Sequence, residues 1–211
     1  MKNDKKNLIL QAACAAFTES GYEKSSIESI SRRAGVAQGL ARYHFVNKET
    51  LYFNALSFVM TGLRNQLQSD VGALSLDKSE ATKKFVRSYM AFTSDASTGY
   101  AMVYREPPFV MLSNPEHMSA LSSLSQEIVQ ILARKLSTNN DPEAAFRMAA
   151  YVVTSLHGVQ RARFSPVYKA LVDIDELADF FAGAVQSLSG EDCKDRISAH
   201  AILSNPVRGC I

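Results

Sequence analysis

Two side chains near residue 40 have the chemistry and the spacing to recognise base pairs. Gln38 and Arg42 stand four residues apart, so a helix would present both on one face. A glutamine amide can form two hydrogen bonds with adenine, and an arginine guanidinium can form two with guanine. Gly39, which has no side chain, would let the backbone approach a ligand closely. These residues predict a short helix that reads bases in the major groove of DNA.

Hydrogen-bond donors flank this segment on both sides. Two adjacent serines stand where a preceding helix would begin, and a helix N-terminus attracts phosphate. The polar side chains after Arg42 can donate to phosphate oxygens. The candidate DNA-contacting residues are Ser25, Ser26, Gln38, Gly39, Leu40, Arg42, Tyr43, His44 and Lys48.

Two short helices must position these side chains. Glu28 follows Ser25 by three residues, which is a capping-box pattern and predicts a helix that Gly35 ends. A second helix is expected over residues 37–45. Two helices joined by a short turn with glycine are typical of a helix-turn-helix, whose second helix enters the major groove. We place this motif at about residues 26–45, although similar patterns also occur in helical proteins that bind no DNA.

Helical periodicity dominates the rest of the chain as well. The chain has ten glycines and six prolines, and no Asn-Gly, Asp-Gly or Gly-Gly pair indicates a β-hairpin. Apolar spacing, glycine stops and N-capping residues predict about nine helices and no strand, which is an all-α fold. Besides the two helices of the motif, the expected helices cover residues 4–20, 48–72, 79–98, 100–106, 115–136, 142–164 and 174–189. Asn47, Asn114, Asp141 and Asp173 are the expected N-caps of four of them.

Four segments near the N-terminus stand in a distinctive order and spacing. They are Phe17 with Gly21-Tyr22, Ala34-Gly35-Val36, Tyr43-His44-Phe45, and Lys48-Glu49-x-Leu51. With them, residues 9–53 closely resemble the DNA-binding domain of the tetracycline-repressor (TetR/AcrR) family. This resemblance covers about a quarter of the chain. The remaining residues agree with the family in length and helical character only.

The resemblance implies a homodimeric, ligand-responsive transcription factor, most often a repressor, that binds a roughly palindromic operator in double-stranded DNA. It places all the candidates above except Leu40 and Arg42 at the family's usual DNA-contacting positions. Arg42 stands where tyrosine is frequent, and Leu40-Ala41 replace a commoner threonine-hydrophobic pair, so the base preference of a relative does not transfer. The implied parts are a DNA-binding domain (1–50), an effector-binding and dimerisation domain (51–190) and a C-terminal tail (191–211).

The resemblance also implies an apolar effector cavity in the larger domain. Aromatic, methionine and polar side chains there are candidates, although such residues at helical spacing also form an ordinary core. The candidate effector-binding residues are Tyr89, Phe92, Tyr104, Arg105, Phe109, His117, Met118, Met148 and Tyr151.

The last two predicted helices are the expected dimer surface. In the family these two helices pair with their symmetry mates, and small and aromatic residues on one face favour close packing of four helices. The alternative is that the two helices only cover their own core. The candidate dimer residues are Val153, His157, Gly158, Phe181 and Ala184.

The formal net charge of +2 conceals an uneven distribution. Residues 1–65 contain nine Lys or Arg against five Asp or Glu, whereas residues 66–211 contain fourteen against sixteen. A basic excess confined to the part that contains the motif favours a polyanionic partner.

Other features exclude several classes of protein. With 46% hydrophobic and 21% charged residues, the chain is neither disordered nor fibrous. Three widely spaced cysteines and four isolated histidines form no disulfide or metal-binding pattern, so we expect no cofactor or metal and a cytoplasmic location. The longest uncharged stretch, residues 50–63, is shorter than the roughly 20 residues of a membrane span. The apolar run over residues 8–16 is too short and too interrupted for a signal peptide.

Two alternatives to an effector-controlled repressor stay open. One is a ligand-independent or protein-regulated DNA-binding regulator, or an activator, of the same fold. The other is a helical enzyme that uses a core cavity. The sequence contains no GxSxG segment, phosphate-binding loop, paired carboxylates or metal-ligand spacing, so we do not expect an enzyme.

Overall fold

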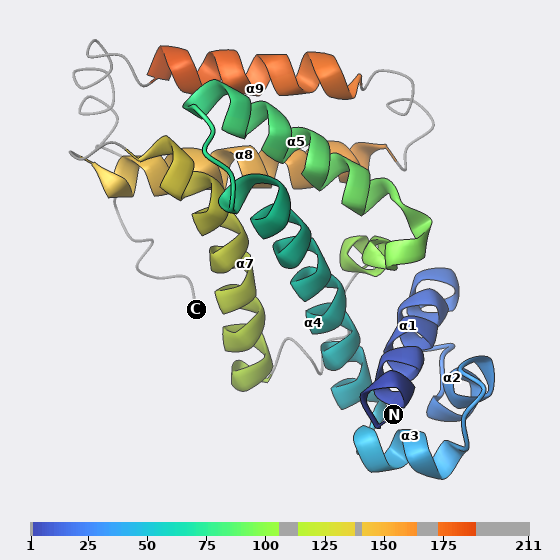
Figure 1. Cartoon of the computed structure of the whole chain (residues 1–211). Coiled ribbons are helices and arrows are strands. Elements are labelled where there is room, and N and C mark those ends of the chain that lie inside the picture. The colour runs from blue at the N-terminus through green and yellow to red at the C-terminus, as the bar shows by residue number, and fades with distance from the viewer. Residues whose placement is uncertain (1, 106–113, 138–140, 164–172, 189–211) are drawn as a thin grey trace, which may run out of the picture.

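A computed structural model describes residues 2–105, 114–137, 141–163 and 173–188 (Figure 1). Within these ranges the chain forms eight α-helices, two 3-10 helices and a π-helical turn, and no strand. The predicted all-α fold is confirmed. In chain order the elements are α1 (Lys2–Ser20), α2 (Ile27–Arg33), α3 (Gln38–His44), α4 (Lys48–Leu67), η1 (Gln68–Gly72), α5 (Lys78–Ser94), η2 (Ala96–Thr98), η3 (Tyr100–Tyr104), α7 (Pro115–Leu136), α8 (Pro142–Ala162) and α9 (Ile174–Leu188).

The first three helices form a small unit around the N-terminal end of α4 (Figure 1). Phe17 of α1 is almost fully buried, and its ring centroid lies 4.9 Å from that of Tyr52 of α4. Tyr22 packs against both rings. Ile30 of α2 and Phe45, just after α3, have no exposed surface. This apolar centre fixes the orientation of α2 and α3 relative to α4.

The long helix α4 connects this unit with the rest of the molecule (Figure 1). Asn47 caps it, as predicted, by accepting a hydrogen bond from the Thr50 backbone N–H at 2.7 Å. Buried apolar residues then follow one face of the helix from Leu51 to Leu67. The helix expected over residues 48–72 ends in the π-helical turn η1, which reaches Gly72. One continuous element therefore links the small unit to the main core.

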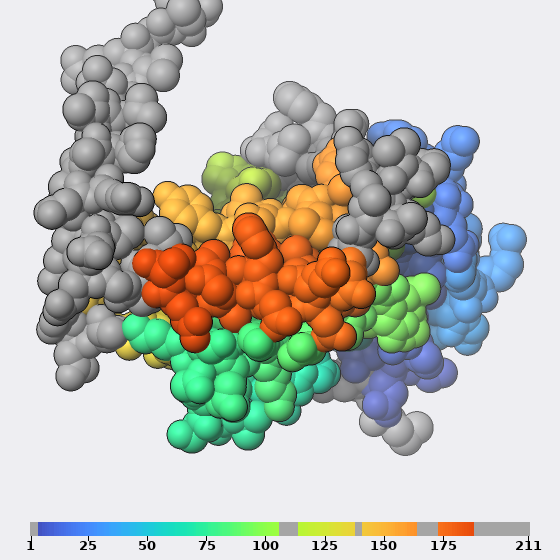
Figure 2. Space-filling model, turned by 90° about the horizontal axis from the view of Figure 1, so that it is seen from above, coloured from blue at the N-terminus to red at the C-terminus, as the bar shows by residue number. Residues whose placement is uncertain are grey.

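The helices α5, α7, α8 and α9 pack together beyond α4. α7 packs on α8, and α9 lies across the outside of α5 (Figures 1 and 2). Ion pairs between Lys83 and Asp179, at 2.6 Å, and between Arg87 and Asp175, at 2.7 Å, join α5 to α9. None of the described helices combines the length and the apolar character that a membrane span requires.

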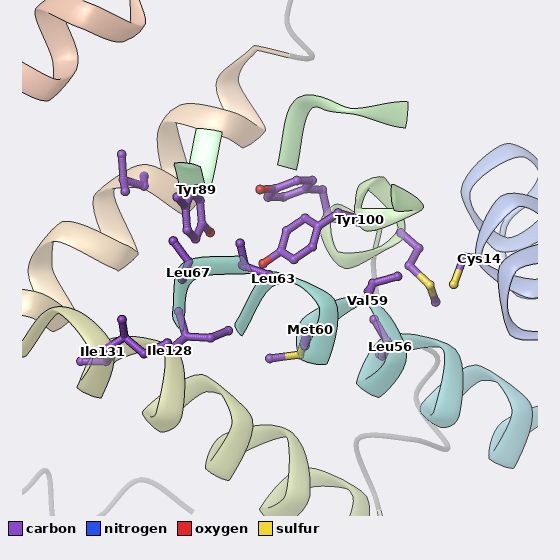
Figure 3. Close-up of a cluster of buried hydrophobic side chains, with 14 of the residues drawn as sticks. Cys14, Leu56, Val59, Met60, Leu63, Leu67, Tyr89, Tyr100, Ile128 and Ile131 are labelled. Carbon is purple, nitrogen blue, oxygen red and sulfur yellow. The ribbon is translucent and has the colours of Figure 1, made fainter. Parts of the chain in front are cut away.

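The main core lies where α4, α5, α7 and η3 meet. Figure 3 shows Leu63 and Leu67 of α4 close to Tyr89 and Tyr100, with the isoleucines of α7 on the other side. All four of these labelled side chains are at most 4% exposed. The core is therefore continuous from α4 into α5 and α7.

Two predicted helices need correction. The helix expected over residues 79–98 begins at Lys78, because Asp77 caps it by accepting a hydrogen bond from the Glu80 backbone N–H. It ends at Ser94, and residues 96–98 form the separate 3-10 helix η2. The helix expected over residues 100–106 is instead the short 3-10 helix η3, which follows Gly99 at a φ of +72°.

The other predicted N-caps are confirmed. Asn114, Asp141 and Asp173 each accept hydrogen bonds from backbone N–H groups in the first turn of the helix that follows. The predicted tail over residues 191–211 lies outside the described residues.

Candidate nucleic-acid interface

The helix-turn-helix consists of α2, a glycine turn and α3. After α2, Gly35 takes a φ of +64°, which favours glycine over other residues. The Val36 backbone N–H donates to the Ser31 carbonyl at 3.0 Å and closes the turn. α3 then buries Ala41 completely against the small unit, so its opposite side faces solvent. The predicted pair of helices around Gly35 is confirmed.

The solvent-facing side of α3 carries most of the candidate base-reading residues. Gln38, Gly39 and Arg42 are exposed, Tyr43 exposes 70% of its surface, and Leu40 is half-buried. A Cβ atom added to Gly39 would meet no atom within 4 Å. Within the described residues this face is therefore open to solvent, and no neighbouring atom requires glycine at its centre.

Glu28 of α2 binds both candidate base-reading side chains. A single carboxylate oxygen, Oε1, accepts hydrogen bonds from Gln38 Nε2 and from Arg42 Nη2, the latter at 2.6 Å. The hydrogen bond from Arg42 is the largest cause of a Glu28 pKa below the usual value. Sequence reasoning missed this contact and treated Glu28 only as a capping residue. No local pattern indicates it, since it joins positions ten and fourteen residues apart.

The two serines before α2 have different environments. Ser26, not Ser25, is the N-cap of α2, and its partner in the capping box is Ser29 rather than Glu28. Ser26 Oγ accepts a hydrogen bond from the Ser29 N–H at 3.1 Å, and the Ser26 N–H donates to Ser29 Oγ at 3.1 Å. Ser25 is 5% exposed and donates its hydroxyl to the Gly21 carbonyl at 2.7 Å. Burial therefore weighs against the predicted phosphate contact of Ser25, whereas Ser26 stays a candidate at the helix N-terminus.

His44 and Lys48 also contact other parts of the small unit. Lys48 Nζ donates to the Tyr22 carbonyl at 3.1 Å and lies 4.2 Å from the centre of the Tyr22 ring. An ammonium group has three donors, so Lys48 keeps others for a phosphate. Nε2 of His44 is buried and has no hydrogen-bond partner among the described residues, so this nitrogen does not face an incoming DNA backbone.

The candidate effector-binding residues do not form one site. Tyr89 and Tyr104 are buried beside Tyr100, and burial raises the pKa of all three hydroxyls, that of Tyr100 to about 12. Tyr104 and Arg105 line a cavity of about 410 Å³ together with Thr18, Ala101 and Arg161. Phe92 lines a different cavity of about 360 Å³ between α1, α4 and α5.

His117 lies at a contact between helices rather than in either of these cavities. Its ring stacks on Phe53 of α4 with centroids 4.0 Å apart, and its Nδ1 lies 3.6 Å from Glu49 Oε1. The start of α7 is thereby packed onto the start of α4, next to the small unit. The prediction that His117 supplies polarity to the pocket is thus replaced by a packing role.

Three other pocket candidates lie apart from these cavities. Met118 and Tyr151 are 39% and 67% exposed, because each points outward from its helix. Met148 is half-buried and packs against the core. Phe109 lies outside the described residues.

The candidate dimer residues are exposed to different extents. Gly158 is exposed, whereas Val153 and Ala184 are half-buried. His157 packs on the Tyr104 ring with centroids 4.8 Å apart, and burial lowers its pKa. His157 therefore faces its own chain.

On α9 the exposed aromatic residue differs from the predicted one. Phe181 is only 9% exposed and packs into the core, whereas its neighbour Phe180 is 67% exposed. Successive helical residues point about 100° apart, so the burial of Phe181 weighs against it as a dimer contact and favours Phe180.

Known proteins share both the motif and the fold. The family model described as "Bacterial regulatory proteins, tetR family" matches residues 9–55, from α1 into α4. The whole fold is similar to that of the transcriptional regulator FadR from Bacillus subtilis, solved in complex with stearoyl-CoA, with a TM-score of 0.65 and 17% identity over 85% of this chain and 97% of that chain. Residues 9–55 therefore carry the domain of the tetR family, and the fold of the whole chain is similar to that of solved tetR-like regulators.

Curated relatives of this chain are distant. The HTH-type transcriptional activator FasR from Mycolicibacterium smegmatis is 24% identical over 107 residues, which cover 49% of this chain and 47% of FasR. The HTH-type transcriptional regulator BetI from Escherichia coli O157:H7 is 23% identical over 168 residues, which cover 72% of this chain and 80% of BetI. The chain thus spans about half the length of FasR.

Gly39→Ala tests how closely DNA approaches α3 of this tetR-family domain. Alanine stabilises a helix by about 1 kcal/mol relative to glycine, and the added methyl group meets open space, so the free energy of unfolding should stay equal or rise. A methyl group between the backbone and the base edges should nevertheless lower operator affinity about tenfold, a change of about 1.4 kcal/mol. Circular dichroism melting and gel-shift titration measure the two effects. Unchanged operator affinity would contradict a close backbone approach at this residue.

Proposed function

We propose that this chain is a dimeric DNA-binding transcriptional regulator that represses its target and leaves its operator when a small molecule binds. One observation carries the proposal: α3 buries Ala41 against the small unit and leaves Gln38, Gly39, Arg42 and Tyr43 on the exposed face of a helix-turn-helix. Amide and guanidinium groups in this position suit adenine and guanine in the major groove. Ser26 and Lys48 flank them as phosphate donors.

Two copies of this motif would bind a palindromic operator. Dimeric helix-turn-helix proteins place their reading helices about 34 Å, one DNA turn, apart. We place the dimer surface on α8 and α9. Tyr151, Thr154, Ser155 and Gly158 form an exposed stripe of α8, and Phe180 is exposed on α9, which crosses the surface in Figure 2. Large exposed aromatic residues beside small ones are typical of a helical interface.

Phe180→Glu tests this dimer surface. A charge at the centre of an apolar interface is poorly compensated, so the dimer dissociation constant should rise at least tenfold, or about 1.4 kcal/mol. Sedimentation velocity over a range of concentrations measures it. Leu74→Glu is the matched control, because Leu74 is an exposed apolar residue that belongs to neither α8 nor α9, and it should leave the dimer unchanged. If the Phe180→Glu and Leu74→Glu proteins had the same dimer dissociation constant, the interface would not include Phe180.

The effector site that we propose is the cavity between α1, η3 and α8. Arg105 and Arg161 both line it, and two guanidinium groups favour an anionic group on the ligand. Arg105 Nη2 also donates to the Thr18 carbonyl of α1 at 2.5 Å. A ligand that pairs with Arg105 would compete with this bond and so act on α1. The stearoyl-CoA complex of FadR, which has a similar fold, supports a small-molecule effector.

Release requires a ligand that prefers one of two states of the dimer. A ligand with equal affinity for the DNA-bound and the free arrangement shifts nothing. α4 joins the reading unit to the core as one element, so a displacement at either end is carried to the other. Such a displacement would change the spacing of the two reading helices.

The proposal is tested by operator titration with and without ligand. A panel of small organic anions is first screened for compounds that raise the melting temperature of the protein, since binding to the folded state stabilises it. A stabilising compound should then weaken operator binding. Stabilisation with no change in operator affinity would exclude release by that compound.

An activator of the same fold is the second candidate function, because FasR is described as a transcriptional activator. A reporter gene behind the operator distinguishes the two. Deletion of the regulator raises expression if the chain represses its target, and lowers expression if the chain activates it.

A further inference from the structure

We propose that Glu28 determines the sequence specificity of this protein: it holds Gln38 and Arg42 in the one arrangement that matches the operator and disfavours other DNA. The inference rests on the proposed function. Glu28 stands in the first turn of α2, outside the helix that reads the bases, so its role is to position two residues of that helix.

The geometry brings three side chains to one oxygen atom. Glu28 Oε1 accepts from Gln38 Nε2 and from Arg42 Nη2, the latter at 2.6 Å. The donors come from successive turns of α3, and the acceptor comes from the other helix of the motif. The side chains of Arg42 and Glu28 are 57% and 43% exposed, so the cluster lies on the surface that would meet DNA.

These bonds leave the base-reading capacity of both side chains available. Arg42 has five N–H donors and commits one to Glu28. Gln38 commits one amide N–H and keeps the second N–H and its carbonyl oxygen, which are the two groups that adenine requires. The bond from Gln38 Nε2 also fixes which end of the amide points away from Glu28. Because both side chains are ordered before DNA arrives, less conformational entropy is lost on binding a matching sequence.

The negative charge of Glu28 acts in the opposite direction on other sequences. Non-specific binding depends almost entirely on contacts between basic groups and phosphates. A carboxylate on the DNA-facing surface repels phosphates, and its negative charge offsets the positive charge of Arg42 that would attract them. Only a sequence that satisfies Gln38 and Arg42 in their fixed arrangement compensates for the repulsion. Glu28 should therefore weaken non-specific binding more than operator binding.

Glu28→Ala and Glu28→Gln test this role against Glu19→Ala. Glu19 is a matched control in the same unit: it is exposed and pairs with Arg33 through two hydrogen bonds of 2.6 and 2.7 Å, but neither partner lies on α3. Glu28→Ala and Glu19→Ala thus each remove one negative charge and free one arginine from its ion pair. Glu28→Gln keeps an acceptor for both donors and removes only the charge.

The readout is the ratio of two affinities at fixed salt: that for a duplex selected by the wild-type protein from a random pool, and that for an unrelated duplex. We expect Glu28→Ala to bind the unrelated duplex more tightly and to lower the ratio at least tenfold. Glu28→Gln should lower the ratio less, and Glu19→Ala should leave it within twofold. Circular dichroism melting confirms that each variant is folded.

A ratio that is the same for Glu28→Ala and Glu19→Ala would overturn the proposal, because Glu28 would then act only as one surface charge among others. A wild-type protein that enriches no sequence from the pool would instead contradict the proposed function itself. The two failures are therefore distinguishable.

Discussion

Replacement of Arg42 by alanine is expected to lower operator affinity about a hundredfold. Arg42 lies on the outer face of α3 with 57% of its side chain exposed, and a guanidinium in that place can donate two hydrogen bonds to guanine. A good pair of this kind contributes roughly 1–3 kcal/mol of discrimination, and a dimer would lose two of them. A hundredfold change corresponds to about 2.7 kcal/mol, which lies within that range.

Gel-shift titration at one fixed salt concentration measures this loss, since phosphate contacts make every affinity depend on salt. Arg134→Ala is the control: it makes the same change of charge at an exposed position of α7. Both variants should have the melting temperature of the wild-type protein, because neither residue is buried. If Arg42→Ala bound the operator as tightly as Arg134→Ala does, α3 would not be the reading helix.

Gly99→Ala is expected to lower the free energy of unfolding by about 2–5 kcal/mol. Gly99 has a φ of +72°, and a left-handed conformation costs roughly 1–2 kcal/mol for a residue with a Cβ atom. The added Cβ would also stand 2.6 Å from Cys14 Cβ of α1. Cβ atoms never pack so closely, so α1 and the turn between α5 and η3 must separate, which adds about 1–3 kcal/mol.

Gly21→Ala isolates the backbone part of this effect. Gly21 has a φ of +78°, but a Cβ added there meets no atom within 4 Å. Chemical denaturation of the two variants should therefore show Gly99→Ala to be the less stable by the cost of the clash alone. Equal stabilities would mean that α1 does not pack closely on the turn before η3.

Features that depend on neighbours in the chain were predictable from the sequence. Asn47 and Asp141 were identified as N-caps because a capping side chain bonds to N–H groups two or three residues ahead. Gly35 was identified as the turn because α2 must end in a left-handed residue before α3 can begin. These features place α3 on the surface and define the candidate reading face.

Features that depend on tertiary contacts were not predictable in the same way. Ser25 and Ser26 are equivalent as N-caps in the sequence, and only the packing of Ser25 on the end of α1 distinguishes them. Tyr89 has the spacing of a cavity residue and of a core residue alike. Its burial among α4, α5 and η3 decides for the core. The two partners of Glu28 could not be identified from the sequence, because their contact with Glu28 depends on the angle between α2 and α3.

Selection of bound duplexes from a random DNA pool tests most directly whether α3 reads a DNA sequence. The wild-type protein should enrich two inverted half-sites whose centres lie one helical turn, or a multiple of it, apart. Arg42→Ala protein should lose the preference at one position of each half-site. Recovery of duplexes with no shared sequence, or of the same sequence by both proteins, would contradict the assignment of α3 as the reading helix.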